Sequence, residues 1–318
     1  MPEQPDSVIE GRGLTRRFGE FVAVAGIDLS VRHGQVFGLL GANGAGKTTA
    51  IRMLCGMLPP TAGEIRVAGI DMLRSPREAR GRIGYVAQRF ALYGDLTVRE
   101  NLALQAGLYG LARPRARARI DWALERLDLG ASAGSRAGRI PLGHQRRLSI
   151  AAGLLHEPDV LFLDEPTSGL DPLARSEFWE LVYELAERGV GVLVTTHYMD
   201  EALFCDRLAL MHAGRIVVES APHNLLARGT ATPLLEVEST DIGACLPLLT
   251  HDPDLLDVVP YAGRLRARLH PGCDGAATAK RILDDARRAG VPVDRVTAAR
   301  AELEDVIVAL LEATGSAA

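Results

Sequence analysis

The sequence predicts an α/β fold in which a sheet core carries a helical insertion and is followed by a small α+β domain. Three observations support this prediction. Short apolar strands alternate with helical segments before residue 90 and again after residue 156. Helical periodicity fills residues 90–156. After residue 232 the expected elements follow the order β-α-β-β-α-β, which is typical of a split βαβ domain.

The first part of the chain is expected to consist mainly of strands. Segments rich in Val, Leu, Ile and Phe are separated by glycines and charged residues, which is typical of strands. These segments are residues 8–18, 21–31, 35–40, 64–72 and 83–88. A buried helix over residues 49–58 interrupts them and is ended by Pro59 and Pro60.

The insertion and the return to the sheet follow. Helical spacing of apolar residues predicts helices at 97–111, 114–129 and 142–155. Strand and helix then alternate again: a strand at 160–166, a helix near 172–187, a strand at 190–197 and a hairpin at 206–220 that turns at Ala213–Gly214. The composition changes near residues 220–233, so we expect two domains, residues 1–228 and residues 229–318.

Composition excludes several classes of protein. The chain has 318 residues, a formal net charge of −4 and a pI near 6.1, which excludes a globally basic nucleic-acid-binding protein. Its four cysteines form no C-x-x-C pair, so we expect free thiols in a reducing compartment and no zinc cluster. The N-terminal residues lack the pattern of a signal peptide, and no apolar run approaches 18 residues, so no membrane span is expected.

The segment GANGAGKT at residues 41–48 fits the pattern G-x-x-x-x-G-K-[ST] between a predicted strand and a predicted helix. Glycines let the backbone aim its N–H groups at phosphate oxygens, and the helix N-terminus adds partial positive charge. Lys47 would bind the outer phosphates and the Thr48 hydroxyl would bind Mg²⁺. Only two of the 36 basic residues are lysines, which favours a function for Lys47 over an ordinary glycine-rich turn.

A second motif, VLFLDEPTSGLDP, occupies residues 160–172. Four apolar residues predict a buried strand, so Asp164 and Glu165 would emerge at its carboxyl end, where parallel sheets bind their ligands. Asp164 suits a magnesium position and Glu165 could polarise an attacking water. Two acidic residues after a strand can also be a solvated loop, but the upstream phosphate loop favours the functional interpretation.

The motifs GANGAGKTT, LDEPTSGLDP and TTHYMDEA, in this order, resemble those of the ATP-binding-cassette ATPases over about residues 8–220. The chain is most similar to the ATPase subunits of ABC-2 type exporters, since QRFALYGDLTVRENL resembles their Q-loop region. The resemblance implies a P-loop NTPase cassette with an antiparallel β subdomain and a helical insertion, plus the small C-terminal α+β domain. It also implies ATP and Mg²⁺ as cofactors.

The resemblance assigns roles to particular residues. Implied ATP contacts are Phe18 (adenine), Gly41, Asn43, Gly44, Gly46, Lys47, Thr48 and Thr49. Implied catalytic residues are Glu165, His197 and Gln88, and implied Mg²⁺ ligands are Thr48, Gln88 and Asp164. Asp171 and the segment Pro141, Leu142 and Gly143 would contact the nucleotide of a second subunit. Without the resemblance, Phe18 could be an ordinary strand residue, and His197 could be a structural histidine.

One motif departs from the family pattern. The usual LSGGQ is replaced by Ile140-Pro141-Leu142-Gly143-His144, so the signature serine is a proline and the first glycine is a leucine. The hydroxyl contact to a partner's γ-phosphate is therefore in doubt. A helix that begins near Leu142 could still present its free N–H groups to an anion.

The resemblance implies an ATP-hydrolysing subunit that dimerises with a second cassette subunit and drives an integral membrane permease. Such a subunit is cytoplasmic and peripheral on the inner face of the cell membrane. The alternative is a nucleotide-gated regulator unconnected to transport, which the retained Glu165 and His197 argue against.

Two further features of the insertion have competing interpretations. Phe90, Leu92 and Tyr93 could line a groove for the permease or fill the insertion's own core. The arginines between residues 113 and 119 favour a solvated helix end over a nucleic-acid or lipid-headgroup patch, since no aromatic residues alternate with them, and no nucleic-acid partner is expected.

Overall fold

The computed structural model describes residues 7–229 and 233–315. The chain divides into two compact units, Met1–Pro222 and His223–Ala318. The division falls after the first residue of helix α8 (Pro222–Gly229), whereas the sequence places it after residue 228. The change in composition at residues 220–233 therefore coincides largely with a helix at the start of the second unit.

The first unit is built on a six-stranded sheet with the order β10-β9-β3-β8-β7-β6. Its strands are β3 (Val36–Leu40), β6 (Ile83–Val86), β7 (Val160–Asp164), β8 (Gly191–Thr196), β9 (Arg207–His212) and β10 (Arg215–Ser220). All are parallel except β10, which pairs antiparallel with β9 at the edge. Every residue of β3, β7 and β8 is buried, as expected of parallel strands covered on both faces.

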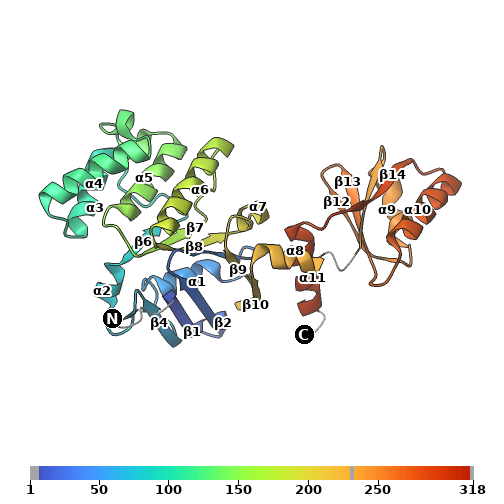
Figure 1. The fold of residues 1–318 in the computed structure, drawn as a ribbon, viewed down its shortest axis with the longest axis horizontal. Helices are drawn as coiled ribbons and strands as arrows, with labels where there is room; N and C mark the ends of the chain where they lie inside the picture. Colours follow the sequence, from blue (N-terminus) through green and yellow to red (C-terminus); the bar gives the residue numbers. More distant parts are fainter. Residues whose placement is uncertain (1–6, 230–232, 316–318) are drawn as a thin grey trace. The chain divides into compact units, whose positions relative to one another are not determined.

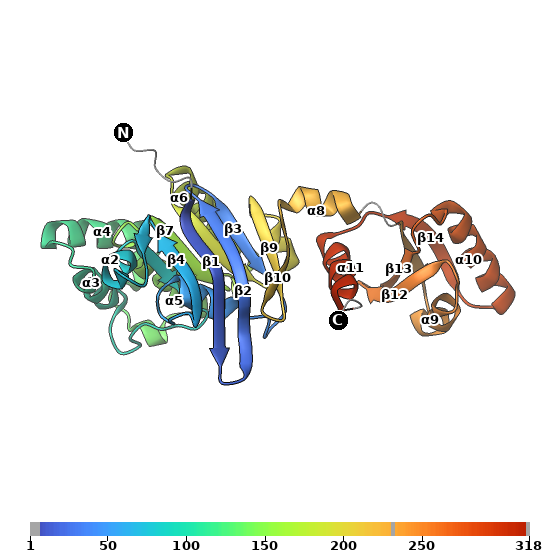
Figure 2. The same cartoon turned by 90° about the horizontal axis from the view of Figure 1, so that it is seen from below.

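A second, antiparallel sheet contains β1 (Ser7–Phe18), β2 (Phe21–Arg32), β4 (Ala62–Val67) and β5 (Ile70–Asp71), in the order β2-β1-β4-β5. Figure 2 shows β1, β2 and β4 lying side by side, in blue. The expectation of one strand at 64–72 is wrong. Ala68 and Gly69 both have positive φ, 50° and 75°, and this turn folds the segment into the β4–β5 hairpin.

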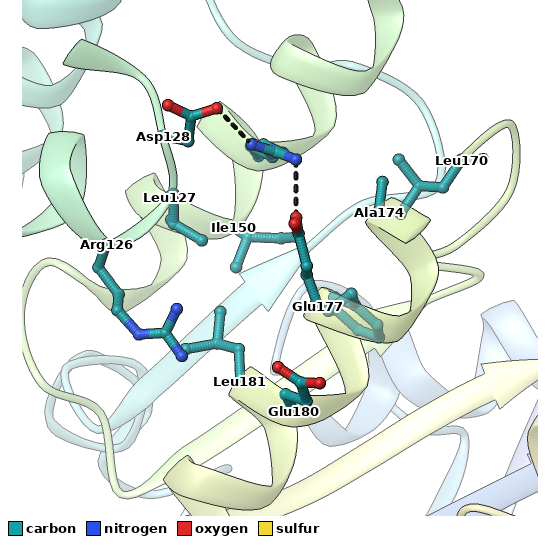
Figure 3. A pocket seen from close by; sticks show the side chains of 11 residues that line it. Arg126, Leu127, Asp128, Ile150, Leu170, Ala174, Glu177, Glu180 and Leu181 are labelled. Carbon is teal, nitrogen blue, oxygen red and sulfur yellow. Dashed lines mark hydrogen bonds and ion pairs between the residues drawn. The ribbon is translucent and has the colours of Figure 1, made fainter. Parts of the chain in front are cut away.

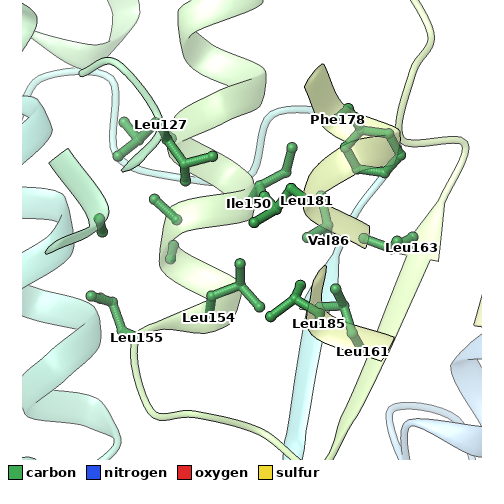
Figure 4. Packing of buried hydrophobic residues seen from close by; sticks show 14 of the residues in the cluster. Val86, Leu127, Ile150, Leu154, Leu155, Leu161, Leu163, Phe178, Leu181 and Leu185 are labelled. Carbon is green, nitrogen blue, oxygen red and sulfur yellow. The ribbon is translucent and has the colours of Figure 1, made fainter. Parts of the chain in front are cut away.

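Two hydrophobic cores lie on opposite faces of the six-stranded sheet, as alternate residues of β7 demonstrate. Phe162 joins the core that contains α1 (Lys47–Leu54) and the antiparallel sheet. Leu161 and Leu163 join the other core, which the insertion and α6 (Pro172–Glu187) cover. Figure 4 shows this second core, where Leu154 and Leu185 pack beside Leu161. Strand residues therefore hold both layers together.

Helices of the insertion gather beside the sheet in Figure 1, in green. They are α3 (Val98–Leu108), α4 (Arg113–Arg126) and α5 (Leu142–Leu154), with short 3₁₀ turns at Gly130–Ser132 and Ala137–Arg139. A capping box begins α3: Thr97 accepts from the Glu100 N–H, and the Glu100 carboxylate accepts from the Thr97 N–H. Two short helices, α2 (Pro76–Arg80) and α7 (Met199–Ala202), complete the unit.

The second unit has the predicted β-α-β-β-α-β order. Its elements are β11 (Leu234–Ser239), α9 (Ile242–Thr250), β12 (Leu255–Tyr261), β13 (Arg264–Leu269), α10 (Gly275–Ala289) and β14 (Val293–Ala299), and α11 (Leu303–Gly315) follows. The sheet order β12-β13-β11-β14 is antiparallel throughout. The unit has its own core, in which Val237 and Leu265 of the sheet pack with Ile282 of α10.

The close contact of α5 with β6 predicts a sharp difference between two glycines. A Cβ added at Gly84 would lie 2.4 Å from the Gly153 carbonyl oxygen, whereas one at Gly107 would meet nothing within 4 Å. Gly84→Ala should therefore lower the free energy of unfolding by about 1–3 kcal/mol, and Gly107→Ala should raise it by about 0.5–1 kcal/mol.

Urea unfolding followed by tryptophan fluorescence measures this difference. Both tryptophans, Trp122 and Trp179, belong to the first unit, so the signal reports on that unit. Equal effects of the two substitutions would contradict the proposed backbone contact.

Candidate functional site

The loop between β3 and α1 has a backbone that requires glycine. Gly41, Gly44 and Gly46 have φ of 151°, 84° and 106°. A Cβ at Gly41 would lie 2.2 Å from the Met211 carbonyl oxygen, and one at Gly46 would lie 2.5 Å from that of Ala23. The loop is therefore pressed against β9 and β2, and side chains at these positions would force it away.

Lys47 begins α1 and is only 5% exposed. Its Nζ donates to the carbonyl oxygens of Gly41 (2.7 Å) and Ala42 (3.2 Å), so the ammonium lies against the loop that precedes it. Burial lowers the pKa of Lys47, while the negative charges of Glu165 and Asp164 act in the opposite direction. The loop thus holds a cation against its own carbonyl oxygens.

The other predicted ATP contacts lie on the same loop and on the first turn of α1. Thr48 and Thr49 lie in the first turn of α1, and Asn43 is exposed on the loop. The N-terminal turn of α1 and the glycine backbone together form the kind of concavity that binds anions.

Asp164 ends β7, beside the start of α1. Its Oδ1 accepts from Thr195 Oγ1 at 2.6 Å and lies 3.4 Å from Thr48 Oγ1. The residue is 2% exposed. A hydroxyl and a carboxylate oxygen side by side are donors that Mg²⁺ accepts, and Mg²⁺ commonly takes its other ligands from water and phosphate. Thr195 was not predicted; its position one residue before a threonine–histidine pair was the available signal.

Glu165 gathers two of the other predicted residues. Its carboxylate accepts from Gln88 Nε2 at 2.7 Å, and His197 Nδ1 lies 3.3 Å from its Oε1. The backbone of Glu165 has a positive φ of 48°. Its N–H donates to the carbonyl oxygen and the hydroxyl oxygen of Thr195, each at 3.1 Å, and these contacts fix the backbone. Gln88, Glu165 and His197, from three different strand ends, therefore form one cluster.

Sequence analysis missed Arg146, which connects two loops of this cluster. Its guanidinium donates to the carbonyl oxygens of Ala87 (2.7 Å) and Gln88 (3.0 Å) on one side, and to those of Glu165 and Pro166 on the other. The residue is 7% exposed, and burial lowers its pKa. Its spacing of four from Ile150, on the buried face of α5, was the signal that could have identified it.

Phe18 and Asp171 lie outside this hydrogen-bonded cluster in the described part of the chain. Phe18 ends β1, is 47% exposed, and has the Arg16 guanidinium 4.6 Å from its ring centre. Asp171 caps α6, accepting from the N–H groups of Leu173 and Ala174 at 3.0 Å each. Those hydrogen bonds lower the pKa of Asp171.

The altered signature segment starts a helix where the sequence predicts one. Pro141 is the N-cap of α5, with φ −53° and ψ 151°, and Leu142 is its first residue. Leu142 is 62% exposed, and a Cβ on Gly169 would lie 3.1 Å from its Cδ2. At Gly143 an added Cβ would meet nothing within 4 Å. The segment therefore lies beside the loop that follows β7, with its N-terminal turn open.

Phe90, Leu92 and Tyr93 could line a groove or fill the core of the insertion, and the structure separates them. Phe90 and Leu92 pack against the core of the insertion, whereas Tyr93 is 60% exposed.

Arg115 is 60% exposed and pairs with Glu157 at 2.5 Å, which fits the interpretation of a solvated helix end. Arg119 does not fit it, because it is 17% exposed and donates to the carbonyl oxygens of Leu154 and Leu155.

A cavity of about 280 Å³ lies between the end of α4, α5 and α6 (Figure 3). Leu127, Ile150 and Leu181 form part of its apolar lining, and Arg147 bridges Asp128 (3.1 Å) and Glu177 (2.8 Å) across it. None of its lining residues belongs to the cluster around Glu165. The cavity is therefore distinct from the candidate site.

Among the described helices, none has the length and apolar character needed to cross a membrane.

Adjacent arginines of α5 give a matched test of the loop connection. Arg146→Lys keeps the charge but cannot reach four carbonyl oxygens, because lysine donates from a single nitrogen. We expect a loss of about 2 kcal/mol or more in the unfolding free energy of the first unit. Arg147→Lys, which alters only surface ion pairs, should change it by about 0.5 kcal/mol or less. Tryptophan-detected urea unfolding measures both, and equal losses would contradict the role of Arg146.

Sequence comparison with known proteins gives consistent results along much of the chain. The family model described as ABC transporter matches residues 24–168. The chain is 39% identical over 308 residues to "Daunorubicin resistance ATP-binding protein DrrA3" of Streptomyces coeruleorubidus, covering 96% of each chain. It is 46% identical over 223 residues to "Probable multidrug ABC transporter ATP-binding protein YbhF" of Escherichia coli (strain K12), covering 70% of this chain but 39% of YbhF.

Solved structures agree with the fold of the first unit. "Structure of ATP binding subunit of ABC transporter" superposes with a TM-score of 0.66 at 28% identity, over 70% of this chain and 93% of that one. The ADP- and phosphate-bound dimer of the cassette MJ0796 gives 0.63 at 26% identity, over 67% and 98%. The predicted fold class and exporter-type resemblance are confirmed, and this chain belongs to the family of ABC transporter ATP-binding proteins.

Proposed function

We propose that this chain binds ATP with Mg²⁺, hydrolyses it, and thereby drives a membrane export transporter as one of two cassette subunits. The observation that carries the proposal is the convergence of Gln88 and His197 on the Glu165 carboxylate, in a unit whose phosphate loop presents Lys47. The charges of Glu165 and Asp164 act on Lys47, which supports a single shared site.

The loop residues Gly41, Asn43, Gly44 and Gly46 bind the phosphates of ATP through backbone N–H groups, with Thr48 and Thr49 at the helix N-terminus. Lys47 exchanges its loop carbonyl partners for the outer phosphates. Phe18 stacks on adenine once the Arg16 guanidinium has moved from its ring.

Thr48 and Asp164 would hold Mg²⁺, and the Gln88 side-chain oxygen would complete the protein ligands, because the Gln88 nitrogen donates to Glu165. When bound there, the cation would supply positive charge that offsets the charge on the phosphates. This donor set is oxygen only, which suits a hard cation.

In the chemical step, Glu165 accepts a proton from water as the water oxygen bonds to the γ-phosphorus. The bond from that phosphorus to the ADP oxygen breaks, so the products are ADP and phosphate. His197, beside Glu165, donates a hydrogen bond to a γ-phosphate oxygen. Each group stabilises charge at the place where it forms.

The partner contributes the second half of each site. Asp171 and the helix N-terminus at Pro141, Leu142 and Gly143 face the nucleotide of the other cassette, and the pair docks on a permease at the inner face of the cell membrane. The names of relatives support export: daunorubicin resistance, probable multidrug transport and "Nod factor export ATP-binding protein I" of Burkholderia orbicola (42% identical over 237 residues, covering 74% of this chain and 78% of the relative).

Glu165→Gln gives the direct test of hydrolysis. The amide keeps the shape of the side chain but is a far weaker base, so ATP should bind while turnover falls by at least about 100-fold. Trapped ATP should hold a closed dimer that gel filtration detects. Lys47→Ala is the comparison variant and should lose ATP affinity as well. Hydrolysis by Glu165→Gln at the wild-type rate would refute the assignment, and a wild type that never hydrolyses ATP would favour the nucleotide-gated regulator.

Pro141→Ser tests the signature segment. The extended backbone of Pro141 is one that a serine N-cap adopts, so the fold should be unchanged. The added hydroxyl can donate to the partner's γ-phosphate, and we expect basal turnover to rise about tenfold or more. ATP binding to the monomer should stay the same. Basal ATPase rates with and without the permease measure the effect; an unchanged rate in both would mean that this segment does not contact the nucleotide.

A further inference from the structure

A buried carboxylate behind the catalytic cluster has no role in the proposed function. Glu201 lies on α7 and is 0% exposed. Its Oε2 accepts from Thr196 Oγ1 at 2.7 Å, and its Oε1 accepts from Thr167 Oγ1. Thr167 and Thr196 are themselves 0% and 1% exposed. A carboxylate removed from water requires such donors, so these contacts determine where both threonines lie.

The two threonines flank the catalytic residues. Thr167 lies two positions after Glu165, in the loop that follows β7, and Thr196 directly precedes His197, at the end of β8. Thr196 Oγ1 also accepts from the Tyr198 N–H at 3.0 Å. Because the hydroxyl has one proton, it donates to Glu201 and accepts from Tyr198, and the backbone on both sides of His197 is held.

A third contact brings α6 into the arrangement. Arg175 Nε lies 3.7 Å from Glu201 Oε1, is buried, and has no hydrogen-bond partner among the described residues. Its NH1 donates to Asp200 Oδ2 at 3.1 Å, and its guanidinium carbon lies 5.4 Å from the centre of the Tyr198 ring. The positive charge of Arg175 therefore lies near the Glu201 carboxylate and near the ring of Tyr198, the residue after His197.

We propose that Glu201 is a positioning residue that keeps His197 beside Glu165 by tying Thr196 to Thr167. This inference rests on the proposed function of His197 and Glu165. Glu201 itself touches neither of them; it sets the separation of the two loops from which they project. Loss of the carboxylate should let the His197 loop move away, and a displacement of about 1 Å at such a site can reduce turnover about 100-fold.

Steady-state ATP hydrolysis by the full chain tests this. Glu201→Ala should lower kcat about 100-fold while KM for ATP stays within about twofold, because the phosphate loop is untouched. Glu201→Gln can satisfy both threonine hydroxyls, one of which reverses its direction, and should restore kcat to within about fivefold of wild type. Asp200→Asn is the matched control on the same helix. The Asp200 side chain is 64% exposed, and the asparagine oxygen can still accept from Arg175 NH1, so kcat should stay within about twofold.

A double-mutant cycle separates positioning from general support of the fold. If Glu201 acts through His197, Glu201→Ala should have no further effect on single-turnover hydrolysis in a His197→Ala background. If the loss of activity in the double variant equals the product of the losses in the two single variants, the proposal is overturned. A Glu201→Ala variant with wild-type kcat would also overturn it. Should Glu201→Ala fail to fold, Thr167→Val removes one hydroxyl at constant shape and should still lower kcat; no change would overturn the proposal.

A spectroscopic measurement separates this inference from the function on which it rests. The ring nitrogen resonances of His197, assigned with His197→Gln, should shift in Glu201→Ala and not in Asp200→Asn. An unshifted His197 would refute the positioning role even if the chain hydrolyses ATP. An inactive wild type whose His197 resonance responds to Glu201→Ala would instead refute the proposed hydrolysis.

Discussion

The candidate site depends on one guanidinium group. Arg146 donates to carbonyl oxygens of the loop after β6 and of the loop after β7, which are distant in sequence and adjacent in the sheet. Without this group, the buried carbonyl oxygens of Glu165 and Pro166 would lose a partner, at about 1–3 kcal/mol each, and the loop after β6 would lose its connection to them. Gln88 and Glu165 project from these loops, so the 2.7 Å hydrogen bond between their side chains depends on Arg146, which holds the backbone of both residues.

Three buried ionisable groups surround the site, and each is satisfied locally. Lys47 donates to its own loop, Arg146 to loop carbonyls, and Glu201 accepts from threonine hydroxyls. Burial of a charge costs several kcal/mol unless such partners exist. These three groups are therefore stabilised by hydrogen bonds to backbone carbonyl oxygens and to threonine hydroxyls. Exposed ion pairs such as Arg115–Glu157 contribute little to this stabilisation.

Local chemistry explains which features the sequence alone predicts. The phosphate loop, Asp164 and Glu165 are recognisable because glycine spacing and an apolar strand are local signals. The β-α-β-β-α-β order of the second unit is likewise visible from periodicity. Contacts between residues far apart in the chain cannot be predicted from such local signals. Two adjacent arginines look alike in sequence, but only Arg146 faces inward, toward a carbonyl 59 positions away.

Smaller errors have the same origin. The split of residues 64–72 into two strands depends on a non-glycine residue, Ala68, with positive φ, which propensity does not favour. The helix α8 was read as a change in composition because its apolar residues are few. Phe90 and Leu92 contribute to a core whose other members come from distant helices, so burial could not be assigned from their immediate neighbours.

The left-handed backbone at Glu165 constrains how this position can change over evolutionary time. Its φ of 48° costs any residue with a Cβ about 1 kcal/mol, and β-branched side chains considerably more. Glycine and asparagine adopt this conformation with least strain. Paralogues that have lost selection for turnover should therefore drift toward glycine, asparagine or aspartate here, and the stability released would make such a loss hard to reverse.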